Sequence, residues 1–160
     1  MILPTISETP LPGAAAIAPG AELSLRLRLL DCRLERRPTA VSRVIVEISM
    51  PSNAEPITCQ REGSACPAGD LRLASLATLD AVSKATGGAL QLELIGAKPI
   101  RAFDTNLVVV AALARREGGV TKIIGAAIAE EDLLLATSRA TLAAVNRLVS
   151  PLLARMPELP

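Results

Sequence analysis

Carboxylates are the main side chains in this sequence that could act on a substrate. The 160 residues include no histidine, tyrosine or tryptophan, which excludes Ser-His-Asp catalysis, Cys-His catalysis and histidine metal sites. Asp31, Asp104 and Asp132 are the candidates for simple acid–base chemistry, and each would need a deep pocket that raises the pKa of its carboxyl group. The sequence does not bring a nucleophile, a base and an oxyanion site together. We therefore predict a protein that is not an enzyme, with a small acid–base enzyme as the alternative.

The remaining reactive groups are three cysteines, Cys32, Cys59 and Cys66. Their odd number and uneven spacing predict reduced thiols in a cytoplasmic protein rather than disulfides. A catalytic cysteine is not expected, because no base stands beside any of the three. A zinc site would need a fourth ligand and a tighter spacing. We expect no metal and no cofactor.

Five residues are the candidates for binding a small ligand. Asp70 and Asp132 open the two predicted helices, where a carboxylate either caps the free amides or contacts a ligand. Asp104 lies in a predicted loop, where it could bind an amine or simply shape the turn. Gly125 and the neighbouring Ala126 leave room either for a ligand or for a second backbone in close strand–helix packing.

Charge and hydropathy exclude two classes of partner. The net charge is only +1, whereas a nucleic-acid binder normally shows a basic face. A double-stranded-RNA-binding module also has three strands before a helix, but it needs lysines at the helix start, where this sequence has Asp70 and Asp132. No apolar run approaches the roughly 20 residues of a membrane span, and no basic residue precedes Arg26 to form a secretory signal. We predict a cytoplasmic protein that binds neither nucleic acid nor membrane.

The sequence contains an internal repeat with an offset of 63 to 65 residues. Three pairs of segments correspond: 27–31 with 92–96, 44–46 with 108–110, and Ala-Thr-Leu-x-Ala-Val at 77–82 with the same pattern at 140–145. A repeat of this length indicates a duplicated supersecondary unit. We interpret each copy as three strands followed by one helix.

Hydrophobic periodicity places these elements along the chain. Period-two alternation and apolar runs predict strands from Leu23 to a turn that begins at Asp31, and then at 41–49, 57–65, 90–95, 106–114 and 121–128. Helices are predicted from Asp70 to about Ala85, where Gly87-Gly88 ends the helix, and from Asp132 to about Pro151, which ends or kinks the helix. Leu73 and Leu76 fall near the polar side of the first helix, which suggests a second surface that is buried against the other helix or against another subunit.

These elements predict an α+β fold with one antiparallel sheet of about six strands and both helices on one face. The expected organisation is a flexible, proline- and alanine-rich arm at 1–22, βββα units at 23–88 and 89–150, and a tail at 151–160. The strand at 107–112 is apolar on both faces. Since one helix layer covers only one face of a sheet, we expect a second copy of the chain to cover the other, giving a homodimer.

The stretch Gly125 to Leu142 resembles a segment of the C-terminal regulatory domain of 2-isopropylmalate synthases. The shared features are a glycine-bearing strand, acidic and apolar residues, a small hydroxyl pair and Ala-x-Leu on the helix. The sequence lacks the family's catalytic barrel, and Arg139 or a neighbour stands where a tryptophan is common. The resemblance implies a tandem βββα fold, a homodimer and a small effector, an amino acid in that family, bound near the helix starts.

Overall fold

Two successive βββα units form the chain in the computed structural model, which describes residues 25–156. The elements are β1 (Arg28–Arg37), β2 (Val41–Ser49), β3 (Ile57–Ser64), α2 (Pro67–Ala85), β4 (Gln91–Ala102), β5 (Thr105–Arg116), β6 (Gly119–Ile128) and α3 (Leu133–Leu153). The α+β class and the repeated βββα unit are therefore confirmed. The arm predicted at 1–22 lies outside the described residues, as do 157–160 at the end of the predicted tail.

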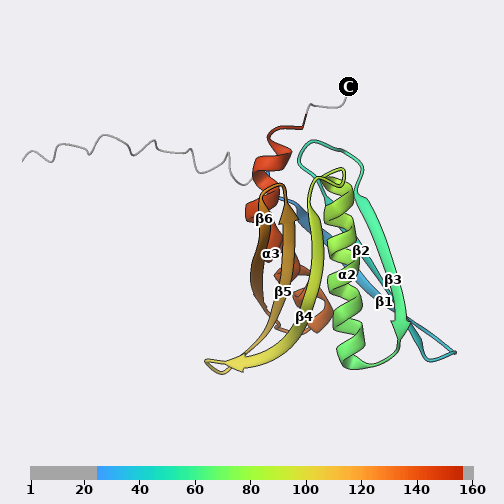
Figure 1. Cartoon of the computed structure of the whole chain (residues 1–160). Helices are drawn as coiled ribbons and strands as arrows, with labels where there is room; N and C mark the ends of the chain where they lie inside the picture. Colours follow the sequence, from blue (N-terminus) through green and yellow to red (C-terminus); the bar gives the residue numbers. More distant parts are fainter. Residues whose placement is uncertain (1–24, 157–160) are drawn as a thin grey trace, which may run out of the picture.

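The six strands form two separate antiparallel sheets, β1-β2-β3 and β4-β5-β6, so the prediction of one continuous sheet is wrong. Figure 1 shows the reason, because α2 lies between β3 and β4 and keeps these strands apart. Each helix packs on the sheet of its own unit and also contacts an edge strand of the other unit, α2 against β4 and α3 against β1. The two helices also contact each other, so the units share one core.

A bulge at the same place in both units explains why the sequence pattern misplaced the ends of β1 and β4. The register shifts between Leu29 and Asp31 in β1 and between Leu94 and Gly96 in β4. One extra residue reverses the inside–outside alternation. The predicted turn after Asp31 is therefore strand as far as Arg37, and the predicted connection after Gly96 is strand as far as Ala102.

The start of α2 differs from the prediction. Cys66 is the N-cap, and its sulfur accepts a hydrogen bond from the Gly69 amide at 3.3 Å. Pro67 occupies the first turn, where its missing amide costs nothing. Asp70 thus lies inside the first turn rather than at the cap. The end of α2 is as predicted, because Gly87 follows it with a φ of 60°.

The last helix begins as predicted and ends later than predicted. Asp132 is the N-cap and accepts hydrogen bonds from Leu134 N at 2.9 Å and Leu135 N at 3.2 Å. Pro151 does not end the helix, which continues to Leu153. A proline so near the end removes only one late hydrogen bond, and the amide of Ala154 still donates to Ser150 O at 3.2 Å.

The repeated Ala-Thr-Leu-x-Ala-Val segments form the centre of the core. Thr78 and Thr141 are buried at equivalent positions, and each donates its hydroxyl to the carbonyl four residues earlier, at 2.7 and 2.8 Å. Leu73 is buried and Leu76 packs against the core. The second buried surface that these two leucines suggested therefore lies within this chain.

Candidate functional site

Gly125 lies on the inner face of β6, directly against the backbone of α3. A Cβ at this position would overlap the carbonyl oxygen of Ala140 and lie 2.5 Å from the nitrogen of Ala144. The room predicted at Gly125 is therefore taken by close strand–helix packing. Ala126 points to the opposite, outer face of the sheet and is exposed.

Asp70 links helix α2 to the sheet of the first unit. Its side chain is only 5 % exposed, and its Oδ2 accepts from Arg36 Nη2 at 2.8 Å. Arg36 also donates to the hydroxyl of Ser42 at 3.2 Å. The second oxygen, Oδ1, has no hydrogen-bond partner among the described residues. Asp70 thus joins α2 to β1 and β2.

The three carboxylates of the acid–base alternative lie in separate places. Asp31 pairs with Arg33 at 3.0 Å on a solvent-facing strand. Asp132 is occupied as the cap of α3. Asp104 is fully exposed at the tip of the β4–β5 hairpin, where Arg101 approaches its carboxylate to 3.9 Å. None of the three is enclosed in a way that would tune a general acid or base.

A hollow of about 480 Å³ lies beside the start of α3. It is lined by Pro99, Ile100, Arg101, Asn106, Ala129, Glu130, Glu131 and Leu133. Residues from β4, β5 and the segment before α3 meet there because the Ala129 amide donates to Asn106 O at 2.8 Å. The lining combines an apolar floor with one guanidinium and two carboxylates. Such a set can hold a small molecule that carries both charges.

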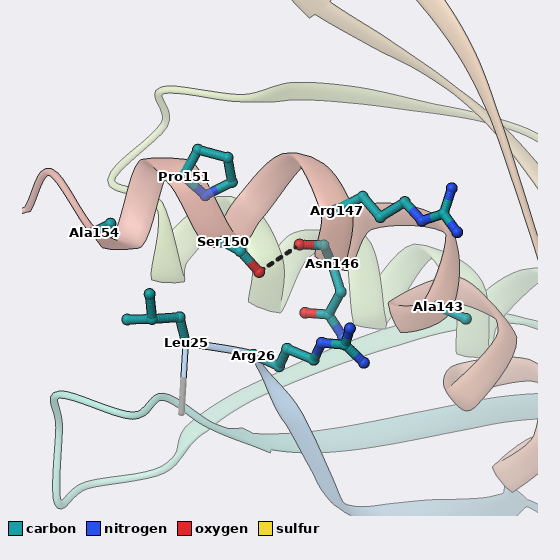
Figure 2. Close-up of a pocket in the computed structure, with 8 residues that line it drawn as sticks. All are labelled: Leu25, Arg26, Ala143, Asn146, Arg147, Ser150, Pro151 and Ala154. Atoms are coloured by element: carbon teal, nitrogen blue, oxygen red, sulfur yellow. Dashed lines mark hydrogen bonds between the residues drawn. The ribbon is translucent and has the colours of Figure 1, made fainter. Parts of the chain in front are cut away.

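A second hollow, of about 540 Å³, lies between the start of β1 and the C-terminal half of α3 (Figure 2). Asn146 makes the hydrogen bonds that join the two sides of this hollow. Its side-chain oxygen accepts from Leu27 N at 3.1 Å, and its side-chain nitrogen donates to Leu27 O at 3.2 Å. The amide of Asn146 therefore acts as a strand partner that fixes the entry into β1. Ser150 donates to the Asn146 carbonyl at 2.9 Å, as the dashed line in Figure 2 marks.

The outer face of β1-β2-β3 is charged. Its ion pairs are Arg33–Asp31 at 3.0 Å, Arg37–Glu62 at 3.4 Å, Arg43–Glu35 at 3.7 Å and Arg43–Glu62 at 2.5 Å. The inner face of the same sheet carries the fully buried Val44, Val46 and Ile48. This alternation is typical of an antiparallel sheet with one face in the core and one in water.

The outer face of β4-β5-β6 is apolar, although its inner face is also in the core. Four large side chains on it, Ile100, Val120, Ile124 and Ile128, are 43–62 % exposed. Half-buried Leu107, Val109, Ala111 and Leu113 form the middle row on β5. The lysines of this face, Lys98 and Lys122, lie on the two edge strands. We call this surface the apolar outer face.

The three thiols are all unpaired, as the cysteine count predicts. Burial raises the pKa of the Cys32 thiol from an ordinary 9.0 to about 11, against the opposing effect of its hydrogen bond with Ser138. A thiol with so high a pKa is a poor nucleophile at neutral pH. Cys59 is buried, and the sulfur of Cys66 serves as the helix cap.

Neither the family models nor the curated proteins compared with this chain include a match to it. Within residues 25–156 no helix is long and apolar enough to cross a membrane. The sequence predictions missed the hollow at the start of α3 and the contrast between the outer faces. A signal for the contrast does exist, because equivalent outer positions read Thr58, Gln60 and Glu62 in β3 but Ile124, Ala126 and Ile128 in β6.

Proposed function

We propose that this protein is a non-enzymatic, regulatory-type domain that forms a homodimer through the apolar outer face and binds a small effector. The observation that carries the proposal is the contrast between two equivalent surfaces of a duplicated unit. The first carries four ion pairs, whereas the second carries one, Arg115–Glu93, and presents three exposed isoleucines. Contiguous exposed apolar surface of this kind marks an interaction site.

A second copy of the chain suits this surface for two reasons. The lysines of the face lie on its edge strands, and its ion pair, Arg115–Glu93 at 3.2 Å, lies at one end of β5, so a copy related by a two-fold axis can bury the apolar row of β5 against itself. Sheets pack face to face about 10 Å apart by interdigitating such side chains. Val109 and Leu113 are only half-buried in the single chain, and packing of this kind would complete their burial.

The effector site that we propose is the hollow at the start of α3. Arg101 offers a guanidinium for a carboxylate, and Glu130 with Glu131 offers acceptors for an ammonium group. An amino acid carries both groups, and its side chain would contact Pro99 and Leu133. Asp132 contributes to this site by capping the helix that forms its wall. The unpaired thiols favour a reducing, cytoplasmic location.

Light-scattering mass measured over a concentration series tests the dimer. We expect a dimer for the wild type and a monomer for Ile124→Lys, because a lysine on the apolar outer face places a charge in the interface. The matched control is Thr58→Lys, since Thr58 is the exposed equivalent of Ile124 in the first unit. A wild-type chain that stays monomeric at its highest soluble concentration would refute the proposal. If the Ile124→Lys variant is still a dimer, the apolar outer face is not the dimer interface.

The effector is tested with a panel of amino acids added to the same samples. Binding should change the melting temperature or the dimer fraction, because a ligand shifts any equilibrium between states that it binds differently. Arg101→Ala should abolish that response while leaving the fold intact, since Arg101 is largely exposed. If no amino acid changes either quantity, the assembly role remains and the sensing role is wrong.

A further inference from the structure

The hollow between the start of β1 and the C-terminal half of α3 differs in charge from the other hollows of this chain. Among the described residues, its lining includes two arginines, Arg26 and Arg147, and no aspartate or glutamate. The hollow at the start of α3 has one arginine and two glutamates. A third hollow, of about 570 Å³ beside β3 and α2, has Asp80 and Lys84. Of these three hollows, only the one at β1 carries positive charge alone.

Neither of the two arginines has an acidic partner within residues 25–156. The ion pairs in this part of the chain use other arginines, such as Arg33, Arg43 and Arg61. Helix α3 offers no partner either, because its sequence from Leu133 to Leu153 contains no acidic residue. The two guanidinium groups are therefore available to bind an anion that the described part of the chain does not supply.

The duplication shows that this charge is confined to one of two equivalent places. The helix repeat has an offset of 63 residues, so Asp80 of α2 corresponds to Ala143 of α3, one turn before Arg147. The strand repeat has an offset of 65 residues, so Gln91 of β4 corresponds to Arg26. Where α2 contacts β4, the helix has an acid and the strand is neutral at these positions. Where α3 contacts β1, the acid is absent and a second arginine is present.

Hydrogen bonds hold the two walls of this hollow together. The side-chain amide of Asn146 bonds to both the nitrogen and the oxygen of Leu27, so the start of β1 is fixed against α3. In Figure 2, the side chains of Arg26 and Arg147 extend in the same direction along the hollow, one from each wall. Two cations are thus presented from elements that are already joined, and a ligand need not order them from separate parts of the chain.

We propose that this hollow binds a small organic anion with two negative charges, either a phosphate monoester or a dicarboxylate. A guanidinium group binds a phosphate or carboxylate through two parallel N–H···O hydrogen bonds, and two guanidinium groups match a dianion. Leu25, Pro151 and Ala154 line the same space and would contact the carbon skeleton. The volume of about 540 Å³ lies in the range of small-molecule sites.

This anion site is separate from the effector site of the proposed function. The two hollows share no lining residue, and they lie at opposite ends of α3. The anion site also lies outside the apolar outer face, so it does not depend on the dimer. A monomeric wild type would overturn the proposed dimer and leave the anion site standing.

Isothermal titration calorimetry of the whole chain tests the site, with inorganic phosphate and succinate as the two probes. We expect saturable binding of one ion per chain, and the probe that binds more tightly identifies the class of ligand. Sodium chloride at matched ionic strength is the control, because general screening of charges by salt does not saturate at one ion per chain. The site is overturned if neither probe binds saturably or if sodium chloride reproduces the response.

Arg147→Gln tests whether the bound ion lies in this hollow. We expect the dissociation constant of the better probe to rise at least about tenfold, as for the loss of charge-assisted hydrogen bonds. The matched control is Arg139→Gln, because Arg139 is an exposed arginine of the same helix that does not line the hollow. Equal losses for the two variants would show general attraction to a basic helix and would overturn the site.

Ala143→Asp tests the comparison between the two units. It introduces the acid of α2 at the equivalent position of α3, four residues before Arg147, where it can pair with the guanidinium and repel an anion. Ala143 is exposed, so we expect the melting temperature without ligand to stay that of the wild type while binding is lost. Binding that survives both Ala143→Asp and Arg147→Gln would overturn the site.

Discussion

Replacing Gly125 by alanine should be the most damaging single-methyl change in this protein. The added Cβ would overlap the carbonyl oxygen of Ala140, and it would lie 2.5 Å from the nitrogen and 3.0 Å from the Cα of Ala144. All three atoms are backbone, so no side-chain rotation can relieve the contact. β6 and α3 must therefore move apart, and part of their packing against the shared core is lost.

The size of the loss in stability depends on which atoms the added Cβ meets. Overpacking a core costs about 1–3 kcal/mol when side chains adjust, and here the neighbours cannot adjust. We expect the free energy of unfolding to fall by about 3 kcal/mol, at the upper end of that range. For a chain of this size the melting temperature should then fall by about 6–12 °C.

Urea and thermal unfolding of Gly125→Ala provide the assay, and Gly96→Ala is its control. A Cβ at Gly96 meets no atom within 4 Å, so this variant should unfold within about 0.5 kcal/mol of the wild type. If both variants unfold alike, Gly125 is not pressed against α3, and its place in the fold would have to be reconsidered. In that case the alternative role of Gly125, leaving room for a ligand, would become tenable again.

Two further predictions concern buried ionisable groups. The pKa of the Cys32 thiol is about 11 in the folded chain and near 9.0 when unperturbed. As the pH rises, the unfolded chain therefore loses this proton first. The free energy of unfolding should fall by up to about 2.7 kcal/mol between pH 9 and pH 11. Urea unfolding at pH 8 and 10.5 should show that loss in the wild type and a smaller one in Cys32→Ala, and equal slopes would contradict it. Arg36→Ala strands the buried carboxylate of Asp70 and should cost about 1–3 kcal/mol in the same assay, whereas Arg33→Ala removes an exposed pair with Asp31 and should cost about 1 kcal/mol or less. Similar losses for the two arginine variants would show that the burial of Asp70 is unimportant.

The repeat was the strongest signal in the sequence because it is a pattern of core positions. Val44 and Val46 correspond to Val108 and Val110, and all four are fully buried. The recurring threonine in each helix makes the same hydrogen bond to the preceding turn. Periodicity reports which residues face the core, so it predicted the class, the order of elements and most strand bounds.

Prediction from the sequence was wrong where one local pattern is compatible with two structures and only tertiary packing decides between them. Asp70 and Asp132 both suit a helix N-cap. In the structure, however, Asp70 binds Arg36, and Cys66 is the residue that caps the helix. The bulges after Leu29 and Leu94 reverse the strand alternation, and nothing in a period-two pattern announces the extra residue.

What the sequence determined by itself is therefore the βββα unit, its duplication and the side chains that the core needs. What only the tertiary structure decided is how the two units meet. α2 separates β3 from β4, so two sheets form instead of one, and Leu73 is buried within the chain. The same arrangement turns one charged and one apolar sheet face outward and gathers Arg101, Glu130 and Leu133 around one hollow. These residues lie up to 32 positions apart in the sequence, and no local pattern relates them, because their proximity results from the packing of whole elements.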